Sequence, residues 1–138
     1  MQPNNLYELC EQVCEAIEAQ PLNYNQDHYA MSARILYGKA ACGTAYCRAG
    51  WMMAVLENKP QSPGSCIGGR ATALLESAGI PSYSIAWLFA AGTVEGERGS
   101  PEYIKNGVAG IRRFMTSWEH KLKTAQIKDG KVLVNDAA

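Results

Sequence analysis

The sequence has no net charge, because 13 lysine and arginine residues are balanced by 13 aspartate and glutamate residues. It therefore lacks the overall positive field that draws a protein to nucleic acid or to an anionic membrane. No apolar run approaches the roughly 18–20 residues that a membrane-spanning helix needs. Aromatic and basic residues are not interleaved in the way that favours nucleic-acid binding. We therefore predict neither a membrane protein nor a nucleic-acid-binding protein.

The sequence also lacks an export signal and contains little histidine. Residues 1–5 do not show the basic and then apolar pattern of a signal peptide. Five cysteines in a chain without such a signal indicate free thiols in a reducing compartment, so we expect a cytoplasmic location. Only His28 and His120 are available as imidazole bases or metal ligands.

The composition, 47% hydrophobic and 19% charged, is typical of a soluble globular protein. We predict an all-α fold, a compact bundle of about five helices over residues 1–125 around one central buried helix. Residues 126–138 are expected to form a tail with a short β-hairpin at Asp129-Gly130, a dipeptide typical of tight hairpin turns. The segment 27–37 fits either a short helix or irregular chain. The helices are predicted from apolar periodicity and end signals over residues 5–19, 45–57, about 70–78, about 81–89 and 100–123.

The helix over residues 45–57 is predicted to lie at the centre of the bundle. Its apolar side chains cover nearly the whole circumference, and Arg48 is its only charged residue before the last position. A helix with this pattern is usually a buried one. Thr44 is a suitable N-cap for it, and Gly43 permits a tight turn before it.

The last helix, over residues 100–123, has the clearest pattern in the chain. It should begin at Ser100, a cap residue that is followed by proline and an acidic residue. Gly107 and Gly110 cost about 1 kcal/mol each relative to alanine, so we expect close packing against another helix there. Its apolar stripe, which can serve either the core or a self-association seam, consists of Ile104, Val108, Ile111, Met115, Trp118 and Leu122.

Charges of opposite sign gather in different parts of the chain. Four glutamates line one side of the first helix, whereas the last third of the chain is basic. We favour two solvated helix faces, which can lie next to each other. The alternative is a basic surface for an acidic partner. The glutamates are Glu8, Glu11, Glu15 and Glu18, and the basic residues are Lys105, Arg112, Arg113, Lys121, Lys123, Lys128 and Lys131.

The run Cys-Gly-Thr-Ala-Tyr-Cys-Arg-Ala-Gly-Trp over residues 42–51 resembles the signature of a family of small, functionally uncharacterised proteins of bacteria and their phages. The resemblance extends more weakly to residue 114, through the segments 78–80 and 87–89. It implies a shared fold and a phage or mobile-element origin, and it brings no reaction with it. Many members of the family carry histidine where this chain has Tyr46, which counts against a metal-binding or catalytic role for Tyr46.

The cysteine motif has three interpretations. In a thiol enzyme, Cys42 would lie before a helix N-terminus, which lowers a thiol pKa, and His28 or His120 would act as the base. In a zinc site, Cys42 and Cys47 would be joined by Cys66 and His28, although a second Cys-x-x-Cys pair is missing. In the third and favoured interpretation, both motif cysteines fill tight space in the core. We therefore predict no cofactor and no metal ion.

If the motif belongs to the core, function is expected on the surface. Candidates are the loops over residues 58–65 and 92–99 and the aromatic side chains of Tyr24, Tyr83 and Trp87. We predict a small protein-interaction module, an accessory factor of a phage or mobile element that binds a host protein, rather than an enzyme. The alternatives are the cysteine-dependent enzyme and the zinc-stabilised structural protein described above.

Overall fold

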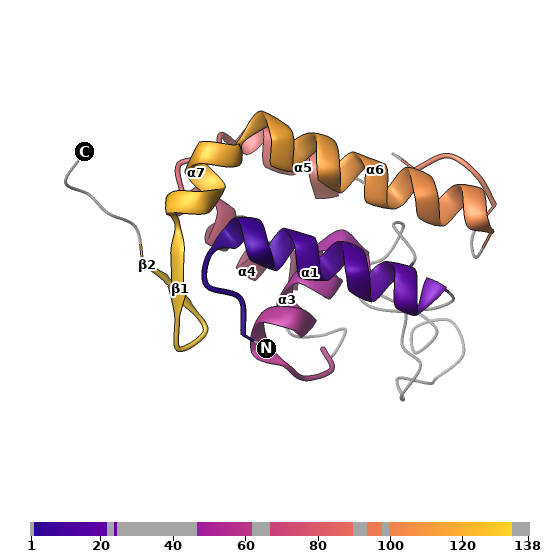
Figure 1. The fold of residues 1–138 in the computed structure, drawn as a ribbon. Helices are drawn as coiled ribbons and strands as arrows, with labels where there is room; N and C mark the ends of the chain where they lie inside the picture. The colour runs from indigo at the N-terminus through magenta and orange to yellow at the C-terminus, as the bar shows by residue number, and fades with distance from the viewer. Residues whose placement is uncertain are drawn as a thin grey trace.

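The computed structural model describes residues 2–21, 24, 47–61, 67–89, 94–97 and 100–133. Most of these residues are helical, and a small antiparallel sheet follows at the C-terminal end, which confirms the predicted fold class (Figure 1). None of the helices among the described residues is long and apolar enough to cross a membrane. The helices are α1 (Leu6–Ala19), α3 (Arg48–Glu57), α4 (Ile67–Glu76), α5 (Ser82–Phe89), α6 (Pro101–Ser117) and α7 (Glu119–Thr124), and the strands are β1 (Gln126–Lys128) and β2 (Lys131–Leu133).

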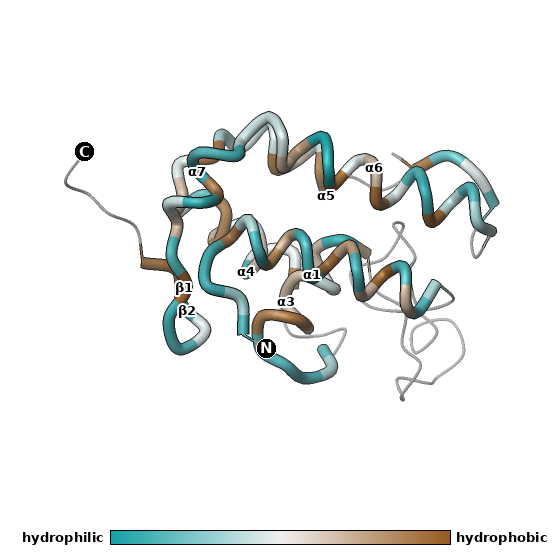
Figure 2. Tube along the Cα trace, in the orientation of Figure 1, coloured by the Kyte–Doolittle hydropathy of each residue, from teal (hydrophilic) through white to brown (hydrophobic). Residues whose placement is uncertain are grey.

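α1 forms as predicted and lies between α6 and α3 (Figure 1). Its N-cap is Asn5, whose side-chain oxygen accepts a 2.8 Å hydrogen bond from the backbone N–H of Glu8. One side of α1 is apolar and buried, and the other carries the glutamates. In Figure 2, α1 and α6 alternate between hydrophilic and hydrophobic residues, which is the pattern of helices with one buried side.

α3 is buried as predicted, but the predicted start of this helix is wrong. The helix begins at Arg48 rather than at Ala45. Cys47 is the N-cap residue, and its extended backbone (φ −77°, ψ −175°) prevents the chain before it from continuing the same helix. The N-cap position is therefore held by Cys47 and not by the predicted Thr44, which lies outside the described residues.

The predicted helix over residues 100–123 is two helices. Ser100 caps α6 as expected, because its hydroxyl oxygen accepts a 3.1 Å hydrogen bond from the backbone N–H of Tyr103. The helix then ends at Ser117, and Trp118 (φ −121°, ψ 25°) turns the chain into α7. The break lets α7 pack against α1, where Leu122 becomes fully buried.

The predicted hairpin forms and docks on the start of the chain. Asp129 and Gly130 both adopt positive φ (55° and 74°), as a two-residue type I′ turn requires. The backbone N–H of Ile127 donates to the carbonyl of Asn4 at 2.9 Å, and that of Leu6 donates to the carbonyl of Ala125 at 3.0 Å. These bonds explain how such a short hairpin is held in place, because an isolated one is marginal in water.

Candidate functional site

Of the residues predicted for a thiol enzyme, His120 alone lies among the described residues, since Cys42 and His28 lie outside them. His120 is exposed on α7. The described part of the motif, residues 47–51, lies elsewhere. The side chain of Arg48 reaches the carbonyl group of Gly107, which is ten residues, or about 15 Å, along α6 from the end of that helix at Ser117. The structure therefore does not bring His120 to the described part of the motif.

The cysteine that does lie at a helix N-terminus is Cys47, and its environment disfavours a thiolate. The side chain is 1% exposed. Burial raises the pKa of the Cys47 thiol to about 11, although the backbone amides of Gly50 and Ala49 lower it. At neutral pH Cys47 is therefore a protonated, buried thiol, which agrees with the space-filling interpretation of this cysteine.

The zinc interpretation depended on four residues, of which Cys47 alone is described; Cys66, like Cys42 and His28, lies outside the described residues. Within the described part of the chain, no group of three or more histidine, cysteine, aspartate or glutamate side chains is arranged to hold a metal ion.

The most unusual group in the core is Arg48, which the sequence pattern did not single out as important. It is 2% exposed. Its Nη1 donates to the carbonyl oxygen of Leu88 at 2.9 Å, and its Nε and Nη2 donate to that of Gly107 at 3.3 and 3.0 Å. Arg48 thus ties the start of α3 to the end of α5 and to the middle of α6. Burial lowers the pKa of its guanidinium, yet arginine starts from so high a value that it stays charged.

The two glycines of α6 make room for this arginine and for a tyrosine. A Cβ atom on Gly110 would collide with the Arg48 guanidinium, and a Cβ on Gly107 would lie 2.5 Å from the Tyr24 ring. Close packing against another helix is therefore confirmed at Gly110, where the side chain comes from α3, whereas the neighbour of Gly107 is a side chain from outside the helices. Tyr24 is 2% exposed and packs on Tyr103, so the expectation that Tyr24 is a surface aromatic is wrong.

The other two aromatic candidates are exposed, as predicted. Tyr83 is 73% exposed and Trp87 is 44% exposed, and their spacing of four places them on one face of α5. The Trp87 ring centroid lies 5.9 Å from Cζ of Arg48 and 5.8 Å from Cζ of Arg113. Both distances are within the range of cation–π attraction. We call Tyr83, Trp87 and the exposed Arg113 the Trp87 patch.

The acidic and basic faces predicted from the sequence do lie next to each other. The Arg112 guanidinium is 3.5 Å from the Glu11 carboxylate and 3.9 Å from that of Glu18, both on α1. Arg113, the next residue, forms no ion pair with any residue that the structure describes. The candidate site is therefore an aromatic face with an available positive charge.

Comparisons of the chain with protein-family models, with curated proteins and with solved structures found no match. The family resemblance of residues 42–51 stays a prediction, and the function of the chain has to be inferred from the site itself.

Proposed function

We propose that the protein is a protein-interaction module, that the Trp87 patch is the centre of its contact surface, and that the partner presents a carboxylate beside an apolar side chain. The observation that supports this proposal is the half-exposed Trp87 ring, which lies close to one buried and one exposed guanidinium. The resemblance of the cysteine motif leads us to propose a phage or mobile-element accessory factor as the setting and a host protein as the partner.

The residue types of the patch suit binding. Tryptophan, tyrosine and arginine are the residues that most often dominate the energy of protein interfaces. A side chain that is already ordered before binding loses less conformational entropy when it becomes buried. We expect this of Trp87, because the buried Arg48, fixed by hydrogen bonds to Leu88 and Gly107, has its Cζ atom 5.9 Å from the ring centroid.

The charge of the patch defines the partner further. α5 contains no charged residue, so Arg113 is the charged member of the patch. Because this guanidinium has no carboxylate partner among the described residues, a partner that supplies one gains a charge-assisted hydrogen bond. A partner with a basic contact surface would be repelled.

The test compares the wild-type protein with Trp87→Ser and Leu133→Ser as baits for host proteins. Leu133 is a matched control, because its exposed fraction of 50% is similar to the 44% of Trp87. It lies on β2 rather than on α5. A partner of the patch should be retained by the wild type and by Leu133→Ser. With the purified partner, Trp87→Ser should raise the Kd about 30-fold, as expected for a central residue that contributes about 2 kcal/mol to the binding free energy.

Two results would contradict this proposal while circular dichroism shows an unchanged fold. One is a partner that binds Trp87→Ser as tightly as the wild type. The other is an equal loss of binding in both variants, which would indicate general stickiness rather than a defined contact surface.

A further inference from the structure

A groove lies between the C-terminal end of α1 and the first three turns of α6. Its volume is about 550 Å³, within the range of roughly 300–1,000 Å³ that is typical of small-molecule sites. Ile104, Val108 and Ala109 of α6 provide apolar lining, and Lys105, Arg112 and Glu18 provide charged groups. The groove is distinct from the Trp87 patch, because none of the three patch residues lines it.

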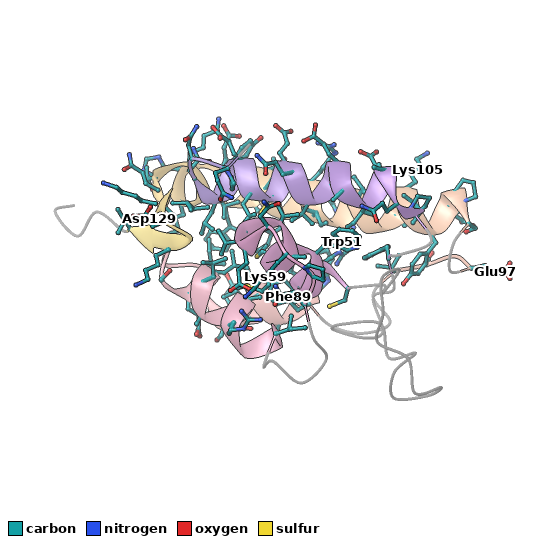
Figure 3. All side chains as sticks on the ribbon, turned by 90° about the horizontal axis from the view of Figure 1, so that it is seen from below. Trp51, Lys59, Phe89, Glu97, Lys105 and Asp129 are labelled. Atoms are coloured by element: carbon teal, nitrogen blue, oxygen red, sulfur yellow. The ribbon has the colours of Figure 1, made fainter. Side chains whose placement is uncertain are left out.

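The charges of the groove favour an anion. Among the described residues that line it, two cations outnumber one carboxylate, which leaves one net positive charge. The carboxylates of Glu11 and Glu18 already share the Arg112 guanidinium. Lys105 is exposed and forms no ion pair with any of the residues that the structure describes. In Figure 3, Lys105 lies near the C-terminal end of α1, so this available ammonium group is at the groove.

We propose that the groove binds an elongated apolar carboxylate, such as a medium-chain fatty acid. The apolar chain lies along Ile104, Val108 and Ala109, which repeat at helical spacing on α6, and the carboxylate pairs with Lys105. This orientation places the anion toward the N-terminal, positive end of α6.

The length of the groove suits an extended chain. The lining residues from Pro101 to Arg112 span eleven helical steps, or about 16 Å. A single flexible chain with one anionic end fits both the volume and the charge.

The test measures the Kd of decanoate by calorimetry, below its micelle concentration, and maps the site by amide chemical shifts. Decanol and decylammonium are the matched ligands, and Lys105→Gln, Ala109→Leu and Arg113→Gln are the matched variants. We expect decanoate to bind more tightly than decanol, and decylammonium not to bind.

The variants test which residues form the site. Lys105→Gln should weaken the binding of decanoate about two- to fivefold, as for other exposed ion pairs. Ala109→Leu should weaken the binding of decanoate, because the larger side chain narrows the groove, and Arg113→Gln should have no effect.

Three results would overturn the proposal. They are the absence of saturable decanoate binding to the wild type, binding of decylammonium as tight as that of decanoate, and shifts that fall outside α1 and α6. Lys105→Gln tests the idea even if Ala109→Leu does not fold. Because Trp87→Ser leaves every groove residue unchanged, failure here does not affect the proposed protein-binding function.

Discussion

Arg112 and Arg113 are neighbours in the sequence, and they face different surroundings on two sides of α6. Arg112 points to α1, where it lies near the carboxylates of Glu11 and Glu18. Arg113 points to α5, where it contacts the ring of Trp87 and no carboxylate of the described residues. One side of α6 therefore balances its charge within the fold, and the other leaves a positive charge beside an exposed aromatic ring.

The difference comes from the neighbouring helices rather than from α6 itself. α1 carries a row of glutamates toward solvent, whereas the eight residues of α5 include no charged side chain. A charge that the fold does not use is available to a partner, and an aromatic ring beside it adds apolar contact area. We infer that the ion pairs of Arg112 on the α1 side contribute to the fold, whereas Arg113 on the α5 side serves the recognition of a protein partner.

The largest effect is expected from Arg48, which supports the α5 side from within the core. Arg48→Ala removes the donor to the carbonyl group of Leu88, at the end of α5, and the additional donor to that of Gly107, which lies inside α6 and keeps its helical hydrogen bond. With about 1–3 kcal/mol for one buried unsatisfied carbonyl group and a further cost for the cavity that the side chain leaves, the free energy of unfolding should fall by about 2–5 kcal/mol. Chemical denaturation of Arg48→Ala beside Arg113→Ala measures this effect. A loss below 1 kcal/mol in Arg48→Ala would show that the buried guanidinium does not hold the two helices together.

The second prediction concerns the space that α6 leaves for Arg48. Gly110→Ala would place a methyl group against the guanidinium, which three hydrogen bonds hold in position. We expect a loss of about 1–3 kcal/mol of stability, even though alanine is the better helix former by about 1 kcal/mol.

A matched glycine provides the control for this prediction. A Cβ on Gly69 of α4 would meet no atom within 4 Å. Gly69→Ala should therefore leave stability unchanged or raise it by up to about 1 kcal/mol. If both substitutions stabilise the protein in thermal unfolding, Arg48 does not pack tightly against α6.

Features that depend on neighbouring residues in the sequence could be predicted. The Asn5 and Ser100 caps, the turn at Asp129-Gly130 and the burial of α3 follow from signals within a few residues of each other. For the same reason Tyr83 and Trp87 were reasonable surface candidates, since both lie away from the apolar side of a short helix.

Features that depend on distant residues could not be predicted. The carbonyl groups that accept from Arg48 lie 40 and 59 residues farther along the chain, so no local pattern reveals why an arginine is buried there. The apolar repeat of the last helix continues through Trp118, and the break follows from the packing of α7 on α1. The burial of Tyr24 depends on the missing side chain of Gly107. Arg113 was therefore not recognised as part of the site, because its role depends on where α5 lies.

The smallest effect on stability is expected from exchanging the charge on each side of α6 in turn. Arg112→Glu places a third carboxylate beside Glu11 and Glu18 and should cost up to about 1 kcal/mol, less at high salt. Arg113→Glu should change stability by less than about 0.5 kcal/mol. For binding the order should reverse. Arg113→Glu should strongly reduce the affinity for an acidic partner of the Trp87 patch at low salt, whereas Arg112→Glu should have little effect on that affinity. Equal effects of the two substitutions on both stability and binding would show that the two sides of α6 do not differ in function.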